Sequence, residues 1–222
     1  MSFNHSPKII TDGLVLCLDG SDPKSNNGST WIDRTNNHST DFTGTPSLIS
    51  GGYDFINNSK IITNRSVETM GEVFTICSFC KVNLLGSDAS GSNRLVSADR
   101  SSGSTKWCLS TNLNYRMQFS GNGGGDRSNS ESFEFELGEL FFVAVSYNHG
   151  IVNLYKNGQK IVDSASILAG TSSFGNVSIA GTPNTADRPW NNPIYTMQFY
   201  NRILTDSEIL QNYKATKGRY QL

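Results

Sequence analysis

Three carboxylates near the middle of the chain have a spacing that glycoside hydrolysis can use. Glu134 and Glu136 lie two residues apart, and Glu139 follows three residues later. Residues i and i+2 of a strand share a face, and carboxyl groups about 5–5.5 Å apart suit a retaining glycosidase. The Leu-Gly pair at 137–138, however, indicates a turn that gives Glu139 a new direction. We therefore expect a solvated strand face here and no catalytic residue.

Two of the four cysteines form a C-x-x-C motif, which elsewhere serves zinc binding or redox chemistry. Cys77 and Cys80 lie within the run VFTICSFCKV at residues 73–82, which reads as a β-strand. Residues three apart on a strand point to opposite faces, so the pair cannot chelate one ion without a bulge. We interpret both as buried free thiols that act as small hydrophobes.

Aspartates in the polar loops offer oxygen ligands for calcium. Asp19 and Asp22, with the amides at 26–27, can supply such oxygens, and so can Asp187. The alternative is that these aspartates form Asx-turns, which are common where Asp meets Gly or Pro. Both interpretations stay open, because spacing alone does not fix a coordination geometry.

One tryptophan lies where a sugar-stacking ring would be placed. Trp190 sits in the polar loop DRPWNN, with Asp187 before it and Asn191 and Asn192 after it. An exposed aromatic ring beside amide and carboxylate groups is suited to glycan binding, but the ring can equally anchor the loop against the protein. The other two tryptophans, Trp31 and Trp107, lie in strand patterns and are predicted to be core residues.

Composition and charge limit the classes of function. The chain has 222 residues and a formal net charge of −1, and Ser, Asn and Gly make up a third of it. This composition favours many short strands joined by polar turns. The absence of a basic stripe argues against nucleic acid as a partner, and no apolar run approaches membrane-spanning length. Residues 1–8 lack the apolar stretch of a secretory signal, so we expect synthesis in a cytoplasm.

The elements that must position these residues are nearly all strands. The last element alone reads as a helix: Thr205 and Glu208 form a capping box, and Gly218 is a plausible stop. Asn157-Gly158 is a strong hairpin signal. Strand-like runs occur at residues 13–18, 31–33, 53–56, 60–63, 73–83, 94–97, 106–109, 115–119, 132–137, 141–147, 151–155, 160–162, 176–181 and 194–200.

Three stretches in order resemble one family of β-sandwiches. They are the strand-turn-strand of residues 141–158 ending in LYKNG, the VSIAG strand at 177–181, and the ending FYNRILTDSEI at 199–209. These resemble concanavalin A-like jelly rolls of the laminin-G-like type. The start TDGLVLCLD, the WID at 31–33 and the end QNYKATKGRY look like the laminin-G-like domains of tailed-bacteriophage structural proteins. The likeness runs from about Ile10 to the C-terminus.

The resemblance implies an all-β fold, an antiparallel jelly-roll sandwich with one short C-terminal helix. We expect an N-terminal arm at 1–12 and one domain at 13–222. The implied function is a non-enzymatic virion surface protein, capsid-decorating or fibre-type. It would be a homo-oligomer that binds other virion proteins through Phe3, His5 and Lys8, although a disordered arm is the alternative.

Other possible functions are a lectin module that reads host glycans and, more remotely, a glycoside hydrolase. Some glucanases of this fold carry Glu-x-Asp-x-x-Glu, but here the middle residue is Glu136. The resemblance implies no cofactor other than calcium.

Overall fold

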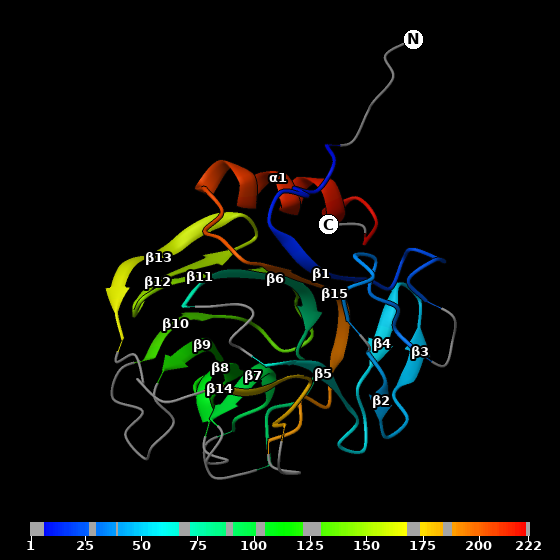
Figure 1. Cartoon of the computed structure of the whole chain (residues 1–222). Coiled ribbons are helices and arrows are strands. Elements are labelled where there is room, and N and C mark those ends of the chain that lie inside the picture. Colours follow the sequence, from blue (N-terminus) through cyan, green and yellow to red (C-terminus); the bar gives the residue numbers. More distant parts are fainter. Residues whose placement is uncertain are drawn as a thin grey trace.

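A computed structural model describes residues 7–26, 30–38, 40–66, 72–87, 91–100, 105–121, 130–167, 174–183 and 188–220. In these ranges the chain forms two antiparallel sheets and one helix (Figure 1). The eight-stranded sheet contains β1 (Leu14–Asp19), β3 (Ser47–Ile49), β4 (Gly52–Asp54), β6 (Val73–Lys81), β11 (Leu140–Asn148), β12 (Ile151–Lys156), β13 (Gln159–Ser166) and β15 (Pro193–Tyr200). The seven-stranded sheet contains β2 (Phe42–Thr43), β5 (Lys60–Ser66), β7 (Arg94–Arg100), β8 (Thr105–Thr111), β9 (Arg116–Gly121), β10 (Ser130–Glu134) and β14 (Phe174–Ile179).

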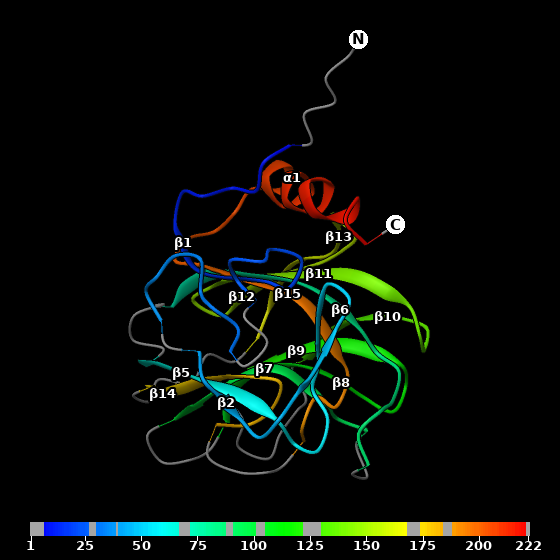
Figure 2. The ribbon, with the colours of Figure 1, turned by 90° about the vertical axis from the view of Figure 1, so that its right-hand side faces the viewer.

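The strand order confirms the jelly-roll sandwich. The larger sheet runs β13-β12-β11-β6-β15-β4-β3, with β1 also paired to β15, and the smaller runs β10-β9-β8-β7-β14-β5-β2. The two sheets stack face to face, as the turned view shows (Figure 2). Between them lies one apolar core to which both sheets contribute, including Trp31, Phe74, Trp107, Phe119 and Phe141. Alternate residues of each strand point into this core, which is the period-two pattern of the sequence.

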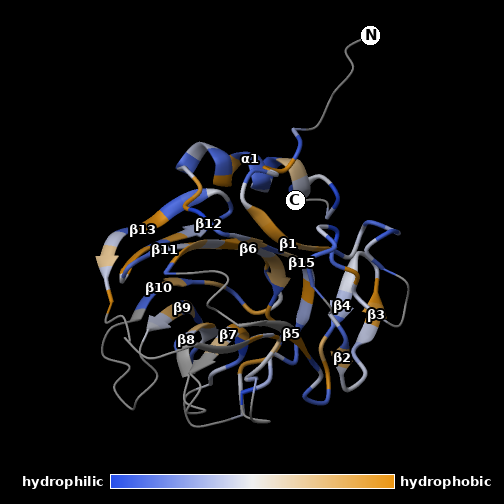
Figure 3. Ribbon diagram, viewed as in Figure 1, coloured by the Kyte–Doolittle hydropathy of each residue, from blue (hydrophilic) through white to orange (hydrophobic). Residues whose placement is uncertain are grey.

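The helix α1 (Asp206–Lys217) covers the outer face of the eight-stranded sheet, where Figures 1 and 2 both place it. Thr205 is its N-cap, and the capping box with Glu208 is complete. A second apolar cluster beneath the helix joins Ile209 to Phe79, Phe142 and Tyr200. The ribbon of α1 accordingly carries both hydrophobic and hydrophilic residues (Figure 3). No helix in the described ranges is long and apolar enough to cross a membrane.

The C-x-x-C cysteines lie on opposite faces of β6, as the strand geometry predicts. Cys77 packs in the cluster beneath α1, and Cys80 packs in the core between the sheets. Both are fully buried free thiols. Burial raises the pKa of Cys77 to about 12 and raises that of Cys80 well above its ordinary value, because a thiolate is poorly solvated there. The pair is therefore structural and does not form a metal or redox site.

The turns agree with the sequence in part. Asn157 and Gly158 both have positive φ, of 52° and 78°, as the two-residue hairpin between β12 and β13 requires. The expected strand at 31–33 is wrong: Trp31 makes only an isolated bridge to Asn26. The short strands β2 and β3 were not predicted, because two or three residues carry too little periodicity to be recognised.

Residues 7–12 of the predicted arm dock on the domain itself. The Asn212 Oδ1 atom accepts a hydrogen bond from the Ile10 amide at 2.8 Å, and the Tyr200 hydroxyl donates to the Ile10 carbonyl at 3.0 Å. Gln211 Nε2 donates to the Lys8 carbonyl at 2.7 Å. Asn212 is fully buried, so this contact belongs to the folded domain. The rest of the predicted arm, residues 1–6 with Phe3 and His5, lies outside the described residues.

Candidate functional site

Four connections meet at one end of the sandwich: β6–β7, β8–β9, β10–β11 and β14–β15. The Gly138 amide donates to the Val82 carbonyl at 2.7 Å, which joins β10–β11 to β6–β7. The Phe135 amide donates to the Tyr115 carbonyl at 2.9 Å, and the Arg94 amide donates to the Arg188 carbonyl at 3.1 Å. These backbone hydrogen bonds hold loops that are distant in sequence side by side. Loops positioned in this way by a rigid β-sandwich commonly carry binding or catalytic residues.

Asn192 clamps two of these loops together. Its side-chain Oδ1 accepts hydrogen bonds from the amides of Asn83 at 2.7 Å and Leu84 at 2.9 Å. Its Nδ2 donates to the carbonyls of Leu84 at 2.9 Å and Trp190 at 2.6 Å. The residue is fully buried, and its amide group makes the four hydrogen bonds that an asparagine side chain can make. Asn192 therefore holds the two loops together, and its buried amide group has no hydrogen-bonding capacity left for a ligand.

Trp190 does not offer a stacking surface. Its side chain is 0 % exposed and packs in the core between the sheets, and Nε1 lies 3.4 Å from the Pro193 carbonyl that accepts its hydrogen bond. The expectation of an exposed ring is corrected, and the alternative of a loop anchor describes what the structure shows. The loop runs into β15, which begins at Pro193, shortly after Trp190. The Trp190 ring therefore packs into the core and anchors the loop at the start of this strand. Asp187 lies outside the described residues.

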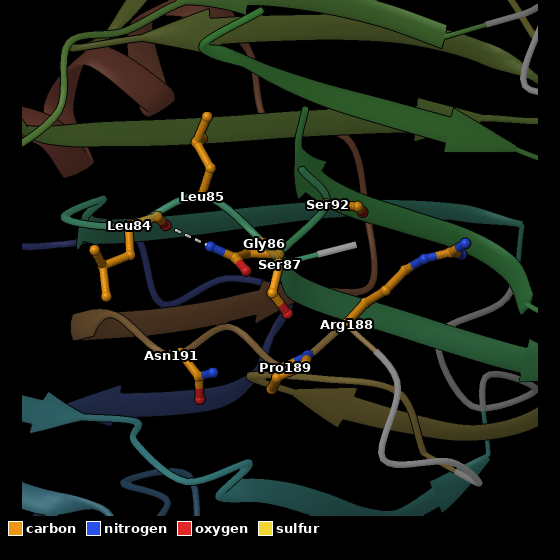
Figure 4. Close-up of a pocket in the computed structure, with 9 residues that line it drawn as sticks. Leu84, Leu85, Gly86, Ser87, Ser92, Arg188, Pro189 and Asn191 are labelled. Atoms are coloured by element: carbon orange, nitrogen blue, oxygen red, sulfur yellow. Dashed lines mark hydrogen bonds between the residues drawn. The ribbon is translucent and has the colours of Figure 1, made fainter. Parts of the chain in front are cut away.

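A small pocket lies above this anchored loop (Figure 4). It has a volume of about 200 Å³, and Arg188 is the charged residue of its lining. Asn191 lines it too, and the Asn58 amide donates to the Asn191 Oδ1 at 3.3 Å. We call it the Arg188 pocket; its lining residues are Leu84, Leu85, Gly86, Ser87, Ser92, Asn93, Arg188, Pro189 and Asn191.

A larger open pocket of about 560 Å³ lies at the same end, between the β8–β9 and β10–β11 turns. We call it the Tyr115 pocket; its lining residues are Asn114, Tyr115, Glu134, Phe135, Glu136 and Leu137. The turn is shaped by Asn112, whose Oδ1 accepts hydrogen bonds from the amides of Asn114 at 3.0 Å and Arg116 at 3.2 Å. Tyr115 has φ of 54° and is 47 % exposed, and Leu137 is 48 % exposed. An aromatic ring is thus presented to solvent beside carboxylate and amide groups.

The three glutamates of the sequence pattern separate as predicted. The strand β10 ends at Glu134, the turn at 137–138 follows with Gly138 at φ of 82°, and β11 begins at Leu140. Glu134 pairs with Arg116 at 3.4 Å, and Glu139 pairs with Lys156 at 2.8 Å. Glu136 is exposed, and its carboxylate makes no ion pair with a described residue. The strand-face arrangement of three carboxylates that a glucanase needs is therefore not formed.

The outward face of the seven-stranded sheet is polar but closed. Ser178, Ser97, Cys108 and Ser120 pair in register across β14, β7, β8 and β9, and each alternates with core residues. All four are at most 8 % exposed. The Ser120 and Ser178 hydroxyls are buried and have no hydrogen-bond partner among the residues that the structure describes. This row is therefore shielded from solvent and offers no accessible polar group.

The two aspartates predicted as calcium ligands already have partners. Asp19 accepts the Ser21 amide at 3.0 Å and pairs with Arg219, and Asp22 accepts the Lys24 amide at 2.9 Å and pairs with Arg34 at 2.9 Å. The Asx-turns are those of the alternative interpretation. Arginine beside each carboxylate opposes cation binding, and no three His, Cys, Asp or Glu side chains gather within the described ranges. These residues do not fit a calcium ion.

A comparison with known protein families identifies the family of this β-sandwich. A laminin-G-like family model, described as the concanavalin A-like lectin/glucanases superfamily, matches residues 50–210. The chain belongs to this superfamily. The resemblance seen in the sequence is thereby confirmed for the fold and the family, and a search of curated proteins gives no match. In this superfamily member, the loops at the end of the sandwich carry the open pockets described above.

Solved structures of this fold include both enzymes and binding domains. Trypanosoma rangeli sialidase is 18 % identical with a TM-score of 0.70, over 95 % of this chain and 34 % of the sialidase chain. The present chain thus spans about a third of that protein. Domain 4 of a GH43 extracellular arabinanase from Geobacillus stearothermophilus, solved in complex with arabinotriose, is 15 % identical with a TM-score of 0.66 over 94 % of this chain and all of that one. The binding domain of Botulinum Neurotoxin DC in complex with SialylT is 16 % identical with a TM-score of 0.65, over 93 % and 52 % of the two chains. At these identities the likeness shows the fold.

Of the residues predicted to bind a glycan, Asn191 lines one of the described pockets, whereas the exposed ring of Tyr115 was not predicted. The run at 115–119 alternates, so Tyr115 was assigned to a strand, whereas β9 begins at Arg116. A signal was present in the Asn-rich stretch TNLNY at residues 111–115, since asparagine favours turns and positive φ. The carboxylates of the pocket were recognised, but as a strand face separate from any aromatic ring.

Proposed function

We propose that this protein is a carbohydrate-binding module and that the Tyr115 pocket is its binding site. The observation that carries the proposal is an exposed tyrosine ring in one pocket with Asn114 and with the carboxylates of Glu134 and Glu136. The apolar C–H face of a pyranose packs on an aromatic ring, while its hydroxyls donate to carboxylates and exchange hydrogen bonds with amides. Two structures of the same fold that were solved with arabinotriose and with SialylT support this class of ligand.

We further propose that binding is not followed by hydrolysis. Glycoside hydrolysis needs one carboxyl group held protonated and a second one facing it across the bond. Here Glu134 and Glu139 each pair with a cation, and the turn at 137–138 separates Glu139 from the other two. Release of sugar products from a bound glycan would contradict this part of the proposal.

The test is a glycan array followed by calorimetric titration of the strongest hit. Tyr115→Ala should weaken binding at least tenfold, a loss of about 1.4 kcal/mol. Glu136→Gln, which keeps the shape but removes the charge, should weaken it less. Ile161→Ala is the matched control, since Ile161 is 50 % exposed on β13 and lies outside the pocket. No binding to any glycan, or binding indifferent to Tyr115→Ala, would refute the proposal.

We also propose a biological setting: a surface protein of a tailed-phage particle that assembles as a homo-oligomer with other virion proteins. The sequence likeness at both ends of the chain supports it. The docked backbone of residues 7–10 sharpens its test, because deleting all of 1–12 would break the contacts to Asn212 and Tyr200. Removing residues 1–6 alone leaves those contacts. The full chain should sediment with particles and the shortened chain should not; a full chain that never sediments with particles would contradict this setting.

A further inference from the structure

We propose that the Tyr115 pocket selects oligosaccharides of amino sugars whose nitrogen carries a positive charge. This inference rests on the proposed carbohydrate-binding function and adds to it the chemical class of the ligand. It follows from a carboxylate of the pocket that the neighbouring cations leave uncompensated, from the aromatic ring in the same pocket, and from the apolar side chains exposed on the same turns.

The backbone holds two carboxylates and the aromatic ring at one place. The Phe135 amide donates to the Tyr115 carbonyl at 2.9 Å, which joins the segment that carries the carboxylates to the turn that carries the ring. The Phe135 side chain is buried in the core between the sheets. Successive residues of an extended segment point to opposite faces, so Glu134 and Glu136, on either side of Phe135, both point away from the core. These two glutamates are the charged residues of the pocket lining.

The cations near the pocket are engaged by other carboxylates than that of Glu136. Arg116 pairs with Glu134 at 3.4 Å, and Lys156 pairs with Glu139 at 2.8 Å. Glu139 Oε2 also accepts a hydrogen bond from the Glu136 amide at 3.0 Å, so the three carboxylates and two cations are neighbours. Glu136 is exposed, and its carboxylate makes no ion pair with a described residue. The excess negative charge therefore lies on Glu136, where it attracts a positively charged group of a ligand.

The Tyr115 ring favours a ligand of the same charge. The face of an aromatic ring is negative and attracts an ammonium group that lies within about 6 Å of the ring centre. An amino sugar can pack its C–H face on this ring while its ammonium group is attracted to both the ring and Glu136. The N-acetylated form of the same sugar keeps the C–H contact but has no charge, and an acidic sugar would be repelled by the glutamates.

The apolar surface of the site favours a sugar chain over a lone amine such as a lysine side chain. Leu113 is 52 % exposed and Leu137 is 48 % exposed, on the same two turns as Tyr115. Exposed apolar residues that gather in this way indicate a binding surface. The pocket volume of about 560 Å³ lies within the roughly 300–1,000 Å³ of a complete ligand site. Linked sugar rings can cover this apolar area, whereas a lysine side chain would leave most of it in water.

The experiment is a calorimetric titration with two matched sugars, the β-1,4-linked trimer of glucosamine and its fully N-acetylated form, at about pH 6, which keeps the sugar amines protonated. Wild type should bind the glucosamine trimer about threefold or more tightly than the acetylated trimer, as expected of an exposed ion pair with a cation–π contact. Raising NaCl to about 0.5 M should remove most of this preference, because exposed charges are screened. Glu136→Gln should weaken binding of the glucosamine trimer more than that of the acetylated trimer. The control is Asp163→Asn, which removes the same charge from a side chain that is 70 % exposed on β13, outside the pocket, and should leave both affinities unchanged.

The outcomes separate this inference from the proposed function. If the two trimers bind equally and Tyr115→Ala weakens both, the selectivity for charged amino sugars is wrong and the carbohydrate site stands. A preference that survives Glu136→Gln, or one that Asp163→Asn removes to the same extent, also overturns the inference. So does Nα-acetyl-lysine amide if it binds as tightly as the glucosamine trimer, because the pocket would then recognise an amine alone. If neither trimer binds, the inference is wrong, and the glycan array decides the proposed function independently.

Discussion

Replacing Asn192 with alanine should destabilise the protein far more than replacing its neighbour Asn191. The Asn192 side chain is fully buried and makes four hydrogen bonds, three of which join the β6–β7 loop to the β14–β15 loop. In Asn192→Ala, the amides of Asn83 and Leu84 lose their acceptor. The carbonyl of Leu84 also loses a donor.

The magnitude follows from the number of backbone groups left without a partner. A buried polar group that loses its hydrogen bond costs about 1–3 kcal/mol, so two orphaned amides cost about 2–6 kcal/mol of the free energy of unfolding. For a chain of this length, each kcal/mol lowers the melting temperature by about 2–4 °C. The Asn191 side chain accepts one long hydrogen bond of 3.3 Å at an exposed position, so Asn191→Ala should cost less than about 0.5 kcal/mol.

The assay is urea denaturation of both variants and the wild type, followed by far-ultraviolet circular dichroism. The midpoint should fall for Asn192→Ala with an unchanged slope, which shows a change in stability without a change in the surface exposed on unfolding. Equal midpoints for the two variants would show that the clamp contributes nothing. The reasoning about the loop end would then be refuted.

Three further predictions follow from burial and charge. Arg202 and the Thr205 amide lower the pKa of Glu208 from its ordinary 4.5 to about 2. The ionised Glu208 carboxylate therefore stabilises the fold above pH 4.5, and this contribution is lost as the pH falls from 4.5 towards 2. Glu208→Gln should cost about 1–3 kcal/mol at pH 7 and flatten the acid limb of a stability-against-pH curve; an unchanged acid limb would contradict the assignment. Cys77 and Cys80 should not react with a thiol reagent in the folded protein and should react on unfolding; fast labelling of either in native buffer would contradict their burial. The three tryptophans, at most 2 % exposed, should emit at short wavelength and resist acrylamide quenching, so a sugar at Tyr115 should leave their emission unchanged; strong quenching would contradict the buried Trp190.

Much of the fold could be predicted from the sequence because its signals are local. Alternation defined the long strands, Asn157-Gly158 fixed a hairpin, and Thr205 with Glu208 marked the start of α1. The opposite faces of Cys77 and Cys80 followed from strand geometry alone. Short pieces escaped: β2 and β3 are too brief for periodicity, and Trp31 lies in a buried loop with the composition of a strand.

The site could be predicted only in part, because exposure is decided by tertiary contacts. Trp190 and Asn192 lie in a polar loop, yet the loop folds inward and the structure uses both residues to fasten it. Tyr115 lies in an alternating run, yet Asn112 turns the chain there and leaves the ring outside. Nothing local to residues 112–115 indicates that the β10–β11 turn will lie beside them. That closeness depends on strands β9 and β10 pairing across the sheet.

The central claim, that the Tyr115 pocket binds carbohydrate, is tested most directly by nuclear magnetic resonance. Backbone amide shifts of the labelled protein would be followed during titration with the strongest glycan from the array. The account predicts that the shifts gather at residues 112–116 and 134–137 and that Tyr115→Ala abolishes them. Shifts confined to other surfaces, such as β13 or the face of α1, would contradict it.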